Sequence, residues 1–389
     1  MKIEQYPAWI FPIGSAFVGA VSWSGCMPAL ALSILMPISV TLQKTRRSAF
    51  LTAFGYYAGA SWPLIPGAKA FFGANATWFE SVLLWLISSY LLALPFGVLW
   101  MSSFRWRPLG TMLALLAVAV PPIGLIGWAS PFIAAGIFFP GTAWLGLAMT
   151  LLICSLSARF PRFLFASSVL LFVLAHGTYR QPLPPASWQA INTKFGSESS
   201  ASDPLGEFRI AEIIQHIIRK SDSKVLIFPE MVIDRWNDAT RAFWEPTLKY
   251  ARGTGKTILI GAGLSVSGQS QSYLNCALIL GAHPAPPFTQ RIPVPLAMWK
   301  PYKPLIGVPL RLRSPGTTMF ADKRVAILIC YEQLLVWPIL ASAAEYPGIL
   351  IGLSNGYWSM GTSIPKVQQA CLNSWAHLFG IPFISASNS

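Results

Sequence analysis

Seven apolar segments occupy the first 180 residues of this chain, and they restrict its fold more than any other feature. The segments are 8–24, 27–42, 49–72, 79–102, 109–128, 131–156 and 163–179. A helix that crosses a bilayer needs about 20 apolar residues. With 54% hydrophobic and 11% charged residues, the chain is too apolar for a soluble protein of its length. We therefore predict a transmembrane domain of about seven helices over residues 1–180.

The basic residues around these segments predict the orientation of the chain. They precede the first segment and follow the second, fourth and sixth, as Lys2, Lys44, Arg46, Arg47, Arg105, Arg107, Arg159 and Arg162. Because cytoplasmic loops are rich in Lys and Arg, seven spans place all of them in the cytoplasm. Two alternatives are a first segment that is a signal peptide, and a fusion of the first two segments, which puts Lys2 opposite Lys44. We expect a multi-pass protein of a bacterial inner membrane, with the C-terminal domain in the periplasm.

The second half of the chain alternates strands with helices. Residues 181–202 are rich in Pro, Ser and Ala and predict a linker that contains a first strand at 188–193. Predicted helices then cover 207–220, 238–252, 333–344 and 365–379, and predicted strands cover 224–228, 257–263, 275–280, 325–330, 348–353 and 382–386, with a proline-rich loop at 283–309. Asp238 is the expected N-cap of its helix. This alternation predicts an α/β domain over 203–389 with a largely buried sheet.

Two polar residues follow the ends of two predicted buried strands. Cys330 ends the strand that begins at Val325, and Glu230 lies just beyond the strand that ends at Phe228. A helix start exposes N–H groups that favour a thiolate, and a carboxylate beside a thiol can act as its general base. A cysteine that ends an apolar run is usually an inert core residue, so the hypothesis depends on Glu230. We expect two parallel strands of one sheet to bring Glu230 and Cys330 to the same edge.

The remaining residues argue against several other classes of site. The five cysteines form no Cys-x-x-Cys pair and the four histidines show no ligand spacing, so we predict no metal and no cofactor. The basic residues of the second half are scattered, and we predict no nucleic-acid binding. A basic exterior is better suited to anionic lipid head groups.

The order of the motifs resembles the carbon–nitrogen hydrolase (nitrilase) superfamily. The resemblance rests on Phe-Pro-Glu230, on Ile-Cys330-Tyr-Glu332 and on Leu-Ser-Asn355-Gly-Tyr-Trp358, and it continues through Pro365, Gly380, Pro382 and Asn388. Behind a multi-span region, this domain is similar to the apolipoprotein N-acyltransferase branch. It also resembles the TraB-type conjugal-transfer proteins of plasmid transfer operons.

The resemblance implies an α-β-β-α sandwich with a Glu-Lys-Cys site. In that family the cysteine is acylated, the glutamate moves the proton and the lysine stabilises the intermediate. Glu230 and Cys330 match two of these roles, and Glu332 matches either a supporting group or a solvated carboxylate. The acyltransferase branch implies a membrane phospholipid as acyl donor and the amino group of a lipoprotein as acceptor. The TraB likeness implies the conjugative transfer machinery as a partner.

The chain departs from the family at the lysine. The matching position holds Gln290, with Arg291 beside it and Lys300 and Lys303 further along the same loop, and we leave open which of the three cations replaces the lysine. An amide can donate a hydrogen bond to an oxyanion but carries no charge. We therefore expect a membrane-bound acyltransferase or amidase with a Cys330 thioester. The alternatives are a catalytically weak scaffold in a conjugative or periplasmic assembly and a soluble-type nitrilase activity on a small amide or nitrile.

Overall fold

A computed structural model describes residues 9–73, 77–195, 206–266, 269–303 and 305–388. The chain divides into two compact units. Unit 1 contains Met1–Gln181, Leu334–Trp337 and Gly361–Ile381, and unit 2 contains Pro182–Gln333, Pro338–Met360 and Pro382–Ser389.

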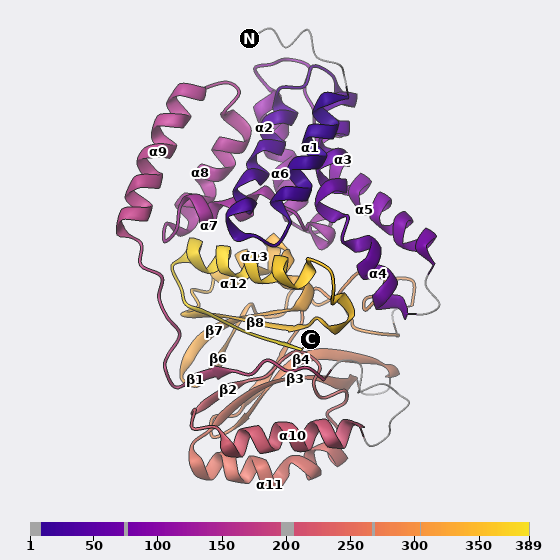
Figure 1. The fold of residues 1–389 in the computed structure, drawn as a ribbon, viewed down its shortest axis with the longest axis vertical. Coiled ribbons are helices and arrows are strands. Elements are labelled where there is room, and N and C mark those ends of the chain that lie inside the picture. The colour runs from indigo at the N-terminus through magenta and orange to yellow at the C-terminus, as the bar shows by residue number, and fades with distance from the viewer. Residues whose placement is uncertain (1–8, 74–76, 196–205, 267–268, 304, 389) are drawn as a thin grey trace. The chain divides into compact units, whose positions relative to one another are not determined.

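Unit 1 is helical (Figure 1). Its helices are α1 (Ile10–Ser22), η2 (Met27–Ile34), α2 (Leu35–Thr41), α3 (Arg46–Ser61), α4 (Leu64–Phe72), α5 (Trp78–Val98), α6 (Arg107–Ala119), η4 (Ile123–Ile126), η5 (Pro131–Ala134), α7 (Ala135–Phe138), α8 (Ala143–Leu156), α9 (Pro161–Thr178) and α13 (Ile364–Phe379). Among the described residues, α5 and α9 are long and apolar enough to cross a membrane. The seven-span topology stays a prediction.

Small residues let helices of unit 1 approach closely. A Cβ added to Gly59 of α3 would lie 1.9 Å from the carbonyl oxygen of Ala16 on α1, and one added to Gly55 would lie 2.2 Å from that of Pro12. Helix α13 is joined to η5 by a hydrogen bond, in which Ser374 Oγ donates to the carbonyl of Ile133 at 2.6 Å. A pair of glycines four residues apart, such as Gly55 and Gly59, is typical of helices that associate in lipid.

Unit 2 contains two sheets that face each other. Sheet A has the order β1 (Trp188–Ala190), β2 (Val225–Ile227), β3 (Thr257–Val266), β4 (Gln269–Gly281) and β5 (Ala285–Thr289), and sheet B has the order β6 (Thr317–Phe320), β7 (Lys323–Ile329), β8 (Ile349–Asn355) and β9 (Phe383–Asn388). The β1–β2, β2–β3, β7–β8 and β8–β9 pairs are parallel, and the β3–β4, β4–β5 and β6–β7 pairs are antiparallel. Unit 2 therefore has the mixed helix and sheet content of the predicted α/β fold, whereas the domain bounds 203–389 stay a prediction.

Two apolar cores explain this layering. The side chains between the sheets come from alternate positions, such as Ile227 of β2 and Ile327 of β7. A second core lies between the other face of sheet A and the helices α10 (Gly206–Lys220) and α11 (Asp238–Thr254) (Figure 1). Helix α12 (Val336–Ala343) follows the short helix η6 (Cys330–Leu334).

The structure corrects three local predictions. The N-cap of α11 is Asn237 and not Asp238, because the Asn237 side chain accepts a hydrogen bond from Thr240 N. The proline-rich loop contains strand β5, which pairs with β4 through only a few residues. One continuous helix from 333 to 344 is wrong, since η6 and α12 share that region.

Candidate active site

Glu230 lies in a tight turn that glycine makes room for. The turn follows β2, and Gly261 of the neighbouring strand β3 passes directly beneath it. A Cβ on Gly261 would lie 2.4 Å from the carbonyl oxygen of Pro229 and 2.5 Å from the Cα of Glu230. Met231, the next residue, has a φ of 50°, which is uncommon for a side chain of its size. The backbone is therefore strained to aim Glu230 inward.

The Glu230 carboxylate is buried among hydrogen-bond donors. Asn275 Nδ2 donates to its Oε1 at 2.6 Å and the backbone N–H of Asn355 donates to its Oε2 at 2.9 Å. Burial raises the pKa of Glu230 to about 7, although the bonds from Asn275, Cys330 and Asn355 act in the opposite direction. A carboxyl group with such a pKa can accept and return a proton near neutral pH.

Cys330 lies at the strained turn that leaves β7. It is the first residue of η6, has a φ of 51° and is buried, and its side chain is hydrogen-bonded to Glu230. Non-glycine residues with this backbone conformation concentrate at functional sites. The expectation that Glu230 and Cys330 follow strands of one sheet is wrong. They follow β2 of sheet A and β7 of sheet B, and the two facing sheets bring them together.

Asn275 is the site residue that the sequence reasoning missed. It lies in the middle of β4, is fully buried, and donates to Gln290 Oε1 at 3.0 Å as well as to Glu230. Gln290 Nε2 in turn donates to the carbonyl of Ile329 at 3.0 Å, beside Cys330. A polar residue within the apolar run from Leu274 to Leu280 was the available signal, because an unpaired buried amide is costly.

Glu332 ties the cysteine turn to the segment after β5. It is fully buried, and its carboxylate accepts from Arg291 N at 2.8 Å, Ile292 N at 3.2 Å and Ile329 N at 3.0 Å. The Arg291 guanidinium pairs with it at 3.4 Å. Glu332 is therefore a buried supporting group and not a solvated carboxylate.

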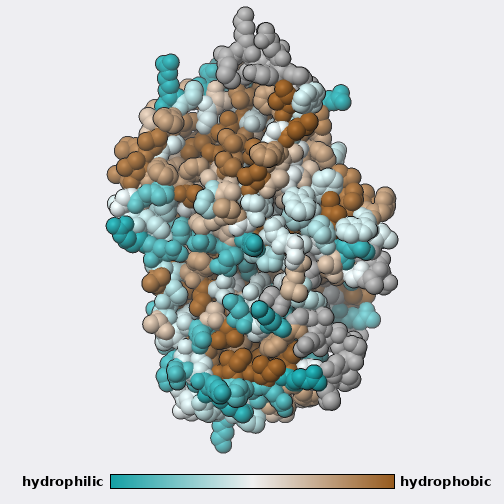
Figure 2. Space-filling view, viewed as in Figure 1, coloured by the Kyte–Doolittle hydropathy of each residue, from teal (hydrophilic) through white to brown (hydrophobic). Residues whose placement is uncertain are grey.

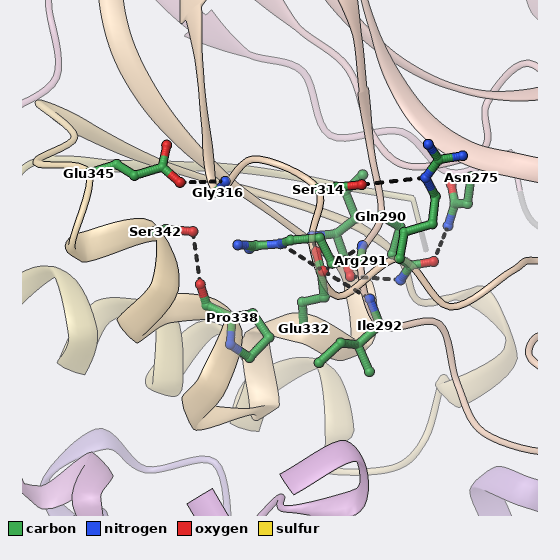
Figure 3. A network of polar contacts seen from close by, with 12 residues as sticks. Asn275, Gln290, Arg291, Ile292, Ser314, Gly316, Glu332, Pro338, Ser342 and Glu345 are labelled. Carbon is green, nitrogen blue, oxygen red and sulfur yellow. Dashed lines mark hydrogen bonds and ion pairs between the residues drawn. The ribbon is translucent and has the colours of Figure 1, made fainter. Parts of the chain in front are cut away.

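Gln290 and Arg291 face opposite ways. Figure 3 shows Gln290 extending toward Asn275, whereas the Arg291 side chain runs toward Gly316. The structure thus brings Glu230, Cys330 and Gln290 together, and it places the Arg291 guanidinium on Glu332. Among the described residues, no group of three or more His, Cys, Asp or Glu is placed to hold a metal ion.

This arrangement is suited to covalent chemistry by the thiol. A nucleophile with an adjacent base and a buried setting is the usual requirement for acyl transfer through a thioester. The side chains that the hydrogen bonds link to Glu230 include the neutral amides Asn275 and Gln290.

Two relatives match all or nearly all of the chain. It is 32% identical to the probable conjugal transfer protein TraB of Sinorhizobium fredii, with 100% of both chains covered. It is 29% identical to the conjugal transfer protein TraB of Agrobacterium fabrum, with 96% of this chain and 91% of the relative covered. No protein-family model matches the chain.

Among solved structures, the chain is similar to an amidase of the nitrilase superfamily from Nesterenkonia. One structure of it, a cysteine-to-alanine mutant, has 13% identity and a TM-score of 0.39, covering 53% of this chain and 78% of the amidase. A further structure of an amidase from Nesterenkonia sp. has 15% identity and a TM-score of 0.38, with 51% and 74% covered.

Proposed function

The chain belongs to the family of TraB conjugal transfer proteins, and we propose that it is a membrane-bound, nitrilase-like acyltransferase or amidase that works through a thioester on Cys330. The observation that carries this proposal is the buried Glu230 carboxylate, held by Asn275 and the Asn355 N–H, beside Cys330 at a turn with positive φ. Burial raises the pKa of Glu230 to about 7, and its hydrogen bond with Cys330 acts in the opposite direction. A buried carboxyl group with a raised pKa beside a cysteine at positive φ is the pattern expected of a functional site.

In the proposed reaction, the Cys330 sulfur attacks the carbonyl carbon of an ester or amide while Glu230 takes the thiol proton. The tetrahedral intermediate then collapses, the bond to the leaving group breaks, and Glu230 returns the proton to that group. In the second half an amine, or water in an amidase, attacks the thioester carbonyl and loses a proton to Glu230. The C–S bond then breaks, the acyl group leaves as an amide or a carboxylic acid, and Glu230 returns the proton to the Cys330 sulfur. Gln290, whose Nε2 donates to the carbonyl next to Cys330, is the side-chain amide assigned to the oxyanion, and an amide in place of a cation predicts a slow enzyme.

A lipid acyl donor is supported by the surface of unit 1. The apolar helix α9 is largely uncovered, with Phe163 and Phe165 more than 70% exposed. Figure 2 shows hydrophobic side chains gathered over the helices of this unit. A helix of this kind is stable in lipid and unfavourable in water. We infer a multi-pass inner-membrane protein with its α/β domain in the periplasm, a phospholipid donor, and a lipoprotein or a conjugation component as acceptor.

A second candidate function is a scaffold within a conjugative transfer assembly. It is favoured by Gln290 at the position that matches the family lysine, and by the names of the two relatives. In this case the Cys330 site has lost its chemistry and the protein acts through its contacts with other components.

Mass spectrometry of the purified protein separates the two. After incubation with phospholipid vesicles, the enzyme is expected to carry an acyl group on the Cys330 peptide and not on the buried Cys276, which matches it as a control. Glu230→Gln should slow this acylation by about 10²–10⁴. If no adduct forms and Cys330→Ser supports plasmid transfer normally, the scaffold function replaces the enzyme.

A further inference from the structure

Asn388 lies where the end of one sheet meets the first strand of the other. It is buried and pairs with Asn355 in the parallel register of β8 and β9. Its Oδ1 accepts from Thr193 Oγ1 at 2.8 Å and from Phe195 N at 2.9 Å. Its Nδ2 donates to Asn355 Oδ1 at 3.0 Å. One side chain therefore joins the segment after β1 to the last residue of β8.

The residue that Asn388 holds is one of the donors to Glu230. The backbone N–H of Asn355 donates to Glu230 Oε2, and the next residue, Gly356, donates its N–H to the carbonyl of Asn388 at 2.7 Å. Side chain and backbone of Asn388 thus both hold the turn after β8.

We propose that Asn388 is a positioning residue, which acts on the Glu230–Cys330 pair by fixing the Asn355 N–H against the Glu230 carboxylate. This inference rests on the proposed function. The chain of contacts runs from Thr193 through Asn388 and Asn355 to Glu230, and every residue in it is in unit 2.

If Asn388 is removed, the protonation of Glu230 is expected to change. A hydrogen bond to a carboxylate favours its charged form, so losing the Asn355 bond raises the pKa of Glu230. A hydrogen bond to a charged group has a free energy that corresponds to about one pKa unit or more. Since Glu230 must be deprotonated to take the Cys330 proton, the reactivity of Cys330 then begins at a higher pH.

The test measures alkylation of Cys330 by iodoacetamide against pH in the full chain, following the Cys330 peptide by mass spectrometry. In the unaltered protein the rate is expected to rise with a midpoint near pH 7, and Glu230→Gln is expected to remove that midpoint. Asn388→Ala should move the midpoint up by about one pH unit. Asn355→Ala removes the acceptor of the hydrogen bond from Asn388 Nδ2 and should give the same shift. It serves as the test if Asn388→Ala folds poorly.

Asn192→Ala is the matched control. The exposed Asn192 accepts from Ser387 N at 3.0 Å, next to Asn388 on β9, and makes no contact with Asn355 in the hydrogen-bond network of the described residues. Its midpoint should equal that of the unaltered protein. If Asn388→Ala and Asn355→Ala both keep the original midpoint, Asn388 only stabilises the fold and the inference is wrong. If the unaltered protein has no midpoint that depends on Glu230, the proposed function fails and the inference fails with it.

Discussion

Replacing Gly261 by alanine tests whether the site depends on how closely two backbones approach. The added Cβ would meet three backbone atoms, Pro229 O at 2.4 Å and both Glu230 Cα and Met231 N at 2.5 Å. Ordinary contacts of a Cβ begin near 3.4 Å, so the turn that carries Glu230 must move by about 1 Å. None of the three atoms belongs to a flexible side chain that can rotate away.

A displacement of this size is expected to separate Glu230 from Cys330. Misplacing a reacting group by about 1 Å can lower a rate by about 10². We therefore expect Gly261→Ala to slow alkylation of Cys330 by iodoacetamide at pH 8 by about 100-fold. Stability should fall by only about 1–3 kcal/mol, as overpacking usually costs.

The assay follows the Cys330 peptide by mass spectrometry, with circular dichroism as the check on folding. Gly253→Ala, in helix α11, is the control, because nothing lies within 4 Å of its added Cβ. In a Glu230→Gln background, Gly261→Ala should slow the reaction little further, since both changes act through the same group. A folded Gly261→Ala protein that reacts at the original rate would refute the reasoning, and so would an equal slowing in both backgrounds.

Three further predictions follow from burial and charge. Because burial raises the pKa of Glu230 to about 7, the folded protein holds this proton more tightly than the unfolded chain. Its contribution to stability is full below about pH 4.5 and is lost as the pH rises through 7, so the free energy of unfolding relative to Glu230→Gln should fall by about 3 kcal/mol from pH 4 to pH 9. A difference that is constant with pH would contradict this. Glu332→Ala should lower the free energy of urea unfolding by about 3–5 kcal/mol, because it leaves the Arg291 guanidinium buried without its ion partner. Glu245→Ala removes the exposed ion pair with Arg252 and should lower the free energy of unfolding by less than about 1 kcal/mol. If both variants lower it equally, Glu332 is not a buried ion partner of Arg291. Alkaline phosphatase fused after Gln181 should be active and green fluorescent protein fused there dark, whereas the reverse result would mean six or eight spans.

The elements of unit 2 were largely predictable from the sequence, because their signals are local. Apolar runs such as 325–329 and 349–353 predict buried strands. Ile210, Ile214 and Ile218, four residues apart, form the buried face of α10, although Ile213 is exposed. The sequence did not predict elements whose local pattern is weak and whose formation depends on a neighbouring strand. Strand β5 contains two prolines and forms only where β4 supplies a partner.

Within the site, local sequence patterns pointed to the residues that the proposed chemistry needs, and the packing of the two sheets brought them together. Glu230 and Cys330 were visible because each follows a buried strand, and a strand end is a local feature. The sequence did not predict that the two residues follow strands of different sheets. Which strands share a sheet depends on packing between distant segments, and a local pattern does not encode it. The same holds for Asn275, whose amide serves both Glu230 and Gln290, and for Gly261, whose missing side chain makes room for the turn. Each of these roles exists only once residues far apart in the chain are in contact.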